Sequence, residues 1–326
     1  METAAVTAPR RRMINSQLIQ RFGVLLALIA LVVFFSIASK GRFASPENLL
    51  TVARQVSMTV IVGVGVTFIM ITGNIDLAVG SYLALSGIFL ANAILLGVPW
   101  WLSVVMAMVV LGMVQFLIGT TIAKQGLSSL IVTLAMLSVA RGVALSWSGG
   151  KPVYIESKAF MQIGNGYWGP IPIPVIIAAC VLVIGQFVLR KTRFGRYVYA
   201  VGGNAEAARS SGINTDRIRI AVFIISGCLT ALAGAIMAAR LFSGSPVAGQ
   251  GFELDVIASI VIGGTSLNGG VGNMVGTLIG AFLVGAISNG LTILGVEYYY
   301  QLMAKGAIIY IAVLIDRSTK SVRNRG

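Results

Sequence analysis

The chain has 326 residues, of which 57% are apolar and 10% are charged, and its mean hydropathy is +0.91. A soluble domain carries about 25% charged residues, so this composition excludes an ordinary soluble protein and indicates an integral membrane protein. Lysine and arginine number 24 against 10 acidic residues, and because the basic residues lie in loops and tails, membrane topology explains the charge without nucleic acid.

Side chains suited to metal binding or catalysis are scarce. The chain has no histidine, and its two cysteines, Cys180 and Cys228, lie apart inside apolar runs. This pattern argues against a His- or Cys-ligated metal site, a disulfide framework and a histidine-dependent catalytic set, although carboxylate chemistry stays open. The P-loop pattern G-x-x-x-x-G-K-[ST] is absent, so any use of ATP would need a separate ATPase.

The N-terminal part predicts a tail followed by a first membrane span. Residues 1–21 are polar, carry four arginines and predict a cytoplasmic tail. Residues 22–39 form an apolar run of nearly the ~20 residues that cross a bilayer as a helix. A signal peptide is the competing interpretation, because a basic region precedes the run and residues 36–38 are small-x-small.

The rest of the chain alternates apolar runs with polar or glycine-rich loops. The further predicted spans are residues 50–72, 83–96, 102–123, 127–147, 171–189, 220–239, 254–264, 274–294 and 302–315. Two of them are short and adjoin glycine-rich interruptions, which predicts broken helices. The fold class is therefore an all-α polytopic membrane protein with about ten transmembrane helices. The transmembrane domain covers 22–316, and residues 317–326 predict a basic cytoplasmic tail.

Charge predicts the orientation of these spans. With ten spans, both termini lie on one side, together with Lys124 and the interval 190–219. That side holds 16 of the 24 basic residues. The positive-inside rule therefore predicts that both termini and the interval are cytoplasmic.

The interval 190–219 is the one long hydrophilic segment between two apolar runs, with seven basic and two acidic residues. Its alanine-rich middle opens with Asn204, a good N-cap residue, and Gly212 follows as a typical helix stop. We predict a short helix over 204–211, flanked by Gly202 and Gly203, across the cytoplasmic end of the bundle. A helix in that place can be pushed by a component outside the membrane.

Two segments of the sequence echo each other. Residues 76–87 read DLAVGSYLALSG and residues 253–264 read ELDVIASIVIGG, with the acid, Leu, Val and closing Gly at the same offsets. One follows a span that runs inward and the other a span that runs outward. This arrangement predicts an inverted-topology repeat with discontinuous helices beside a pathway.

Polar residues near these breaks are candidates for a translocation pathway. A carboxylate at membrane depth, such as Asp76, is tolerated only beside a cavity or a partner. One interpretation makes Asp76 part of a pathway for a hydroxyl-rich solute, and the other makes it a capping acid at a helix start. The candidate pathway residues are Asn74, Asp76, Ser81, Asn268 and Asn289. Glu253 and Asp255 are predicted to lie at a periplasmic rim or to act as docking acids. Alternatively, they belong to a solvated helix start.

A glycine stripe occurs near the end of the chain. Gly272, Gly276 and Gly280 are spaced by four, so a helix presents them on one face. Close packing between helices is the first interpretation, and direct lining of a pore is the second.

Three blocks of the sequence together resemble one protein family. They are NIDLAVGSYLALSG at 74–87, FGRYVYAVGGNAEAARSSGI at 194–213 and ELDVIASIVIGGTSLNGGVGNMVGTLIGA at 253–281. Over residues 50–315, the chain is similar to the permease subunits of sugar-type ABC importers, the ribose, xylose and arabinose permease family. The family pattern usually has serine at the position of Ala78, so this chain lacks one hydroxyl group there.

The resemblance implies an assembly in the bacterial inner membrane. Its implied partners are a second permease chain (identical or related), membrane lipid, two cytoplasmic ATPase domains and a periplasmic sugar-binding protein. ATP and Mg would be bound by the ATPase, and this chain would bind no cofactor and would not be an enzyme. The implied coupling residues, resting in a groove of the ATPase, are Gly203, Asn204, Ala205, Glu206, Ala207 and Ala208.

Three functions are open at this point. The first is an ABC importer permease that passes a monosaccharide (a pentose, hexose or related polyol) without covalent change. The second is a self-sufficient secondary transporter, which would need more embedded ionisable groups for ion coupling than Asp76. The third is a membrane enzyme or scaffold.

Overall fold

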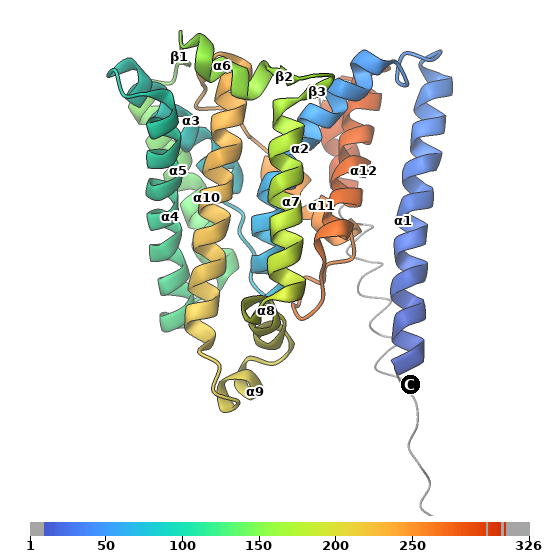
Figure 1. The fold of residues 1–326 in the computed structure, drawn as a ribbon, viewed down its shortest axis with the longest axis vertical. Coiled ribbons are helices and arrows are strands. Elements are labelled where there is room, and N and C mark those ends of the chain that lie inside the picture. Colours follow the sequence, from blue (N-terminus) through green and yellow to red (C-terminus); the bar gives the residue numbers. More distant parts are fainter. Residues whose placement is uncertain (1–9, 298, 308–309, 311–326) are drawn as a thin grey trace, which may run out of the picture.

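Long helices that run side by side make up most of the chain (Figure 1). The computed structural model describes residues 10–297, 299–307 and 310, so the predicted C-terminal tail and half of the predicted span at 302–315 fall outside the described residues. The helices of the bundle are α1 (Arg10–Ala38), α2 (Pro46–Ile71), α3 (Val79–Leu95), α4 (Trp100–Gln125), α5 (Ser129–Ser148), α7 (Ile173–Lys191), α10 (Thr215–Leu241), α11 (Phe252–Ile262) and α12 (Met274–Ile293).

The predicted all-α polytopic membrane class is confirmed. Within the described residues, six helices are long and apolar enough to cross a membrane, namely α2, α4, α5, α7, α10 and α12. Helix α3 and the apolar part of α1, Gly23–Ala38, are shorter apolar helices. Helix α2 is apolar and buried on nearly all sides, whereas α4 and α7 expose residues such as Phe116 and Phe187. An exposed apolar surface of this kind suits a bundle surrounded by hydrocarbon.

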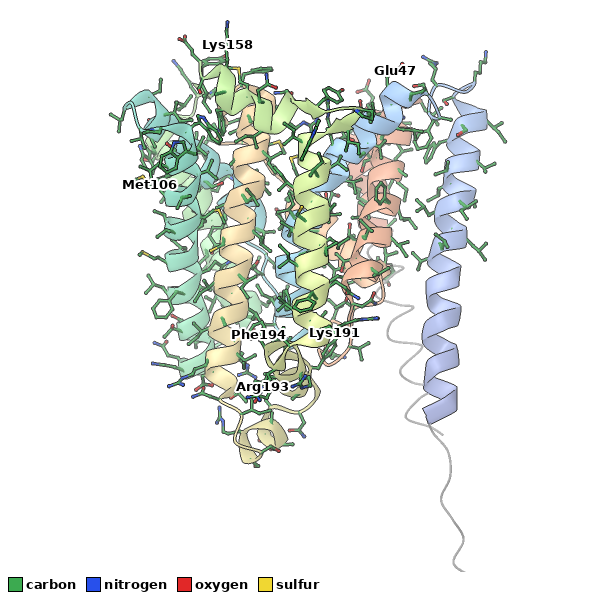
Figure 2. All side chains as sticks on the ribbon, viewed as in Figure 1. Glu47, Met106, Lys158, Lys191, Arg193 and Phe194 are labelled. Atoms are coloured by element: carbon green, nitrogen blue, oxygen red, sulfur yellow. The ribbon has the colours of Figure 1, made fainter. Side chains whose placement is uncertain are left out.

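The two ends of the bundle carry different small elements (Figure 1). One, here called the α6 end, carries α6 (Lys158–Asn165), β1 (Val153–Tyr154), β2 (Tyr167–Trp168), β3 (Ile171–Pro172) and β4 (Ser243–Gly244). Strand β1 pairs antiparallel with β4, and β2 pairs antiparallel with β3. The other, here called the α9 end, carries α8 (Arg193–Gly203) and α9 (Ala205–Ser210). Figure 2 shows Glu47 and Lys158 at the α6 end and Lys191 and Arg193 at the α9 end.

Helix α8 was not predicted within the polar interval. It begins where the Thr192 side chain accepts a hydrogen bond from the Gly195 N–H at 3.2 Å. Val198 and Val201 are buried while Arg196 is exposed, so α8 is an amphipathic helix at the end of the bundle. Its mixture of arginines, glycines and apolar residues concealed the helical period in the sequence.

Helices α11 and α12 approach each other through glycines. A Cβ atom on Gly276 would lie 1.9 Å from the Gly263 carbonyl oxygen, and one on Gly280 would lie 1.9 Å from the Ser259 carbonyl oxygen. Any side chain at either position would therefore push the two helices apart. The packing interpretation of the glycine stripe is confirmed for these two residues, whereas Gly272 precedes α12.

Candidate functional site

Two irregular segments interrupt the helices inside the bundle and lie against each other. The 72–78 segment joins α2 to α3, and the 263–273 segment joins α11 to α12. The Gly270 N–H donates a hydrogen bond of 2.9 Å to the Ile71 carbonyl oxygen, which connects them. Irregular backbone at membrane depth is stable only where protein buries it or where it lines a cavity. The contact between the two segments therefore packs irregular backbone against protein.

The first turns of the short helices α3 and α11 also meet. A Cβ atom on Gly80 would lie 2.2 Å from the Glu253 carboxylate and 2.3 Å from the Gly249 carbonyl oxygen. Helix α3 continues from Gly80 to its end at Leu95, and at a rise of about 1.5 Å per residue this stretch is roughly 20 Å long. The two helices then diverge, because α3 leads to the α6 end and α11 leads to the 263–273 segment (Figure 1).

The echoing segments thus start next to each other, but their helices begin at different offsets. Helix α3 begins three residues after Asp76, whereas α11 begins one residue before Glu253. The inverted repeat therefore stays a prediction.

Asp76 is fully buried and held from two sides. One carboxylate oxygen accepts a hydrogen bond of 2.9 Å from the Ala78 N–H, just before α3. The other accepts a hydrogen bond from the side-chain amide of Gln115 on α4. The first contact is that of an Asx turn just before α3, whose N-cap residue Ala78 makes no side-chain capping hydrogen bond, and the second ties the 72–78 segment to α4.

Hydroxyl and amide groups with unused hydrogen-bonding capacity lie inside the bundle. The following buried atoms make no hydrogen bond to another described protein group: Ser81 Oγ, Tyr82 Oη, Gln115 Oε1, Ser226 Oγ and Thr230 Oγ1. They come from α3, α4 and α10. Buried polar atoms are normally paired, so groups of this kind can accept or donate to water or to a polyhydroxy solute.

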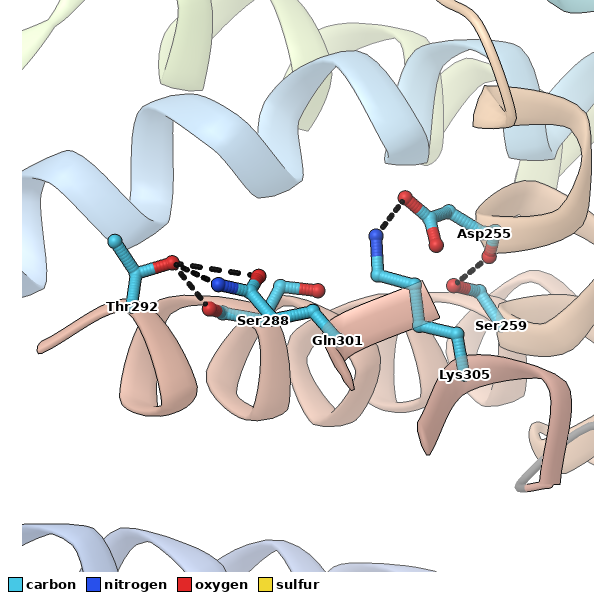
Figure 3. A network of polar contacts seen from close by, with 6 residues as sticks. All are labelled: Asp255, Ser259, Ser288, Thr292, Gln301 and Lys305. Carbon is cyan, nitrogen blue, oxygen red and sulfur yellow. Dashed lines mark hydrogen bonds and ion pairs between the residues drawn. The ribbon is translucent and has the colours of Figure 1, made fainter. Parts of the chain in front are cut away.

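Glu253 and Asp255 are half-buried in the first turn of α11, and their place at a periplasmic rim stays a prediction. The chain between α10 and α11 passes the start of α3, where Gly249 and Glu253 lie next to Gly80. Glu253 carries a buried carboxylate oxygen with no hydrogen bond to any described group. Asp255 forms an ion pair of 2.9 Å with Lys305 (Figure 3). Arg141 of α5 holds this part of the chain by donating to the carbonyl oxygens of Pro246 and Ala248.

The three predicted asparagines of the pathway have different surroundings. The Asn74 amide donates to the Thr72 hydroxyl at 3.0 Å within the 72–78 segment. Asn268 is exposed, and its carbonyl oxygen faces Gly73. Asn289 exchanges amide hydrogen bonds of 2.9 and 3.0 Å with Asn48 near the start of α2. Asn74 and Asn268 therefore lie near the junction of the two segments, whereas Asn289 lies toward the α6 end.

Helix α9 lies at the tip of the α9 end (Figure 1). The Asn204 side chain accepts a hydrogen bond of 2.9 Å from the Ala207 N–H, and Gly212 has a φ of 82° just after the helix, as the sequence predicted. Of the predicted coupling residues, Gly203, Asn204, Glu206 and Ala207 are exposed and Ala205 is half-buried. Ala208 is only 5% exposed. Ala208 therefore packs against the protein itself, and the others present the free face of α9.

Two residues of this site were missed in the sequence, Gln115 and Arg141. Each is a polar or charged residue within an otherwise apolar run, which is the signal that could have found them. Their partners are far away in the chain, so the sequence does not reveal what they hold.

Known relatives of this chain are transport proteins. A family model described as the permease component of branched-chain amino acid transport systems matches residues 48–313. The chain is 41% identical to the ribose import permease protein of Bacillus subtilis (strain 168), over 97% of this chain and 99% of that protein. It is 42% identical to the ribose import permease protein of Escherichia coli (strain K12), over 89% and 92%. It is 35% identical to the xylose transport system permease protein of Haemophilus influenzae, over 93% and 97%.

The chain belongs to this family of transport-system permease components. It is a multi-pass membrane protein of transport and not an enzyme, as the sequence predicted.

Proposed function

We propose that the chain is the membrane-spanning permease subunit of an ATP-binding-cassette importer for a monosaccharide, either a pentose, a hexose or a related polyol. The observation that carries the proposal is the similarity, over about nine-tenths or more of the chain, to permeases named for ribose and xylose. The family description names amino acids, but the buried hydroxyl and amide groups around Tyr82 and Gln115 suit a polyhydroxy solute.

The proposed assembly supplies what this chain lacks. A cytoplasmic ATPase binds ATP and Mg and contacts α9 and the residues just before it, through the exposed Gly203, Asn204, Glu206 and Ala207 and the half-buried Ala205. Ala208 anchors the helix from the buried side. A second permease chain, identical or related, lies alongside in lipid, and a periplasmic sugar-binding protein delivers the solute. This chain binds no cofactor.

The proposed pathway follows the polar residues along the bundle. Asn268 lies toward the α9 end, Asn74, Asp76 and Ser81 lie at and before the start of α3, and Asn289 lies toward the α6 end. Glu253 and Asp255, in the first turn of α11, form the periplasmic rim of this pathway. Closure of the ATPase pushes α9, and the spans then rock so that the pathway opens first to one side and then to the other.

Uptake of D-ribose tests the function. We expect the chain, reconstituted in liposomes with its ATPase and sugar-binding protein, to accumulate ribose only when ATP is present. Accumulation of ribose by this chain alone, driven by an ion gradient, would instead establish a secondary transporter. Uptake of leucine but not of ribose by the full assembly would contradict the sugar assignment.

Orientation has its own test. We propose ten spans related in part by an inverted repeat, with both tails (1–21 and 317–326) and the interval 190–219 in the cytoplasm of a bacterium and the α6 end in the periplasm. A reporter enzyme inserted after Asn204 is expected to read cytoplasmic, and one inserted after Tyr154 periplasmic. The same reading from both insertions would refute this topology.

A further inference from the structure

The last turn of α8 fits directly against the hydrogen bond that joins the two irregular segments. A Cβ atom on Gly202 would lie 1.7 Å from the Ile71 carbonyl oxygen and 2.7 Å from the Gly270 backbone nitrogen. These are the acceptor and the donor of that bond. Gly202 therefore touches the 72–78 side and the 263–273 side at once, and no side chain separates the three backbones.

Further contacts surround this point. A Cβ atom on Gly269 would lie 2.8 Å from the Gly73 nitrogen and 3.0 Å from the Gly202 carbonyl oxygen. The Tyr199 hydroxyl, one turn earlier in α8, donates a hydrogen bond of 2.6 Å to the Gly272 carbonyl oxygen. The term glycine junction is used here for Ile71, Gly73, Gly202, Gly269 and Gly270. Because backbone atoms cannot rotate away as side chains can, a push on one member displaces the others.

The junction is also continuous with α9. Helix α8 ends at Gly203, and the next residue, Asn204, is the N-cap of α9. Only Gly203 and Asn204 therefore separate Gly202 from the first residue of α9. Phe194, at the other end of α8, lies with its ring 6.0 Å from the ring of Phe68 on α2, which keeps α8 against the bundle.

We propose that the glycine junction transmits movement of α9 to the two irregular segments, with Gly202 as a positioning residue for transport. From the junction, one segment leads to Asp76 and α3, and the other leads to α12. The glycine junction therefore contacts the connections within both helix pairs, α2 with α3 and α11 with α12. This inference rests on the proposed function, because it requires a partner that pushes α9.

Alanine scanning of two glycines tests the junction. Neither Gly202 nor Gly142 has a positive φ, so alanine is compatible with the local backbone conformation at both, and the two positions differ in what the added Cβ atom would meet. Gly142, in α5, is exposed, and a Cβ atom there would meet nothing among the described residues within 4 Å. In the complete importer in liposomes, Gly202→Ala is expected to keep the ATPase bound and hydrolysing ATP, while D-ribose uptake per ATP falls about tenfold. Gly142→Ala is expected to stay within about twofold of the parent.

Tyr199→Phe provides a variant that adds no bulk. It removes the hydrogen bond to Gly272 and is expected to lower uptake per ATP about threefold. Equal uptake per ATP in Gly202→Ala and Gly142→Ala would overturn the proposal. If Gly202→Ala does not assemble, Tyr199→Phe decides, and parental coupling in that variant would overturn it as well. Failure of the parent to bind an ATPase, or to take up any pentose, hexose or related polyol, would refute the proposed function instead.

Discussion

Replacing Ala207 with tryptophan is expected to weaken binding of the ATPase subunit by at least about 30-fold, the effect of losing a strong interface contact. Ala207 is exposed on α9, and its own side chain is small, which allows a partner to approach the helix closely. An indole ring there occupies the space that the partner needs. Because the side chain points away from the protein, the fold and membrane insertion should be unchanged.

Copurification of the ATPase with the tagged chain measures this loss. Ala44→Trp is the matched control, because Ala44 is also exposed but lies at the α6 end, near the start of α2. Glu206→Trp should behave as Ala207→Trp does. Enlarging Ala208 would not be informative, because that residue is buried and the change would disturb packing. Parental ATPase binding and uptake in Ala207→Trp would show that α9 is not the coupling surface.

Local signals in the sequence predicted α9 well. Asn204 as the N-cap and Gly212 as the stop are effects of neighbouring residues, so they can be seen without knowledge of the fold. Helix α8 was missed because its apolar period is short and interrupted by glycines and arginines. Helix α10 begins at Thr215, five residues before the predicted span, because the Asn214 side chain caps it through the Arg217 N–H. The apolar run marked the membrane part of α10 but not its polar first turn.

The features of the site that could not be predicted from the sequence depend on contacts between residues far apart in the chain. The acid at position 76 marked a special site, but its partner Gln115 is 39 residues away and on another helix. The contact of Glu253 with Gly80 depends on how the chain after α10 passes the start of α3. The contact of Gly202 with Ile71 and Gly270 joins three distant parts of the chain. The sequence shows that these residue types are unusual in their apolar surroundings, but only the fold shows which residues they contact.

Replacing Gln115 with glutamate is expected to remove most of the folded protein. The amide donor that holds Asp76 would become a second buried carboxylate at hydrogen-bond distance from the first. An uncompensated buried charge costs about 3–5 kcal/mol, which is a large part of the ~5–15 kcal/mol that stabilises a typical fold. The fraction of monodisperse protein after detergent extraction measures the loss.

The double variant Asp76→Asn with Gln115→Glu is the decisive control. It restores one carboxylate and one amide with their positions exchanged, and the amide oxygen at position 76 can still accept from the Ala78 N–H. Folding is therefore expected to recover to within about 1 kcal/mol of the parent. Asp76→Asn alone should also fold, because the unpaired oxygen of Gln115 can turn to accept from the new amide.

Transport by these two variants separates the roles of Asp76. If the carboxylate belongs to the pathway, both variants fold but take up D-ribose about tenfold more slowly, because position 76 no longer carries a charged hydrogen-bond acceptor. Parental uptake by folded Asp76→Asn would leave Asp76 only the structural role of holding the 72–78 segment against α4, and would remove it from the pathway. Failure of the double variant to fold better than Gln115→Glu would mean that the two side chains do not form the tether described here.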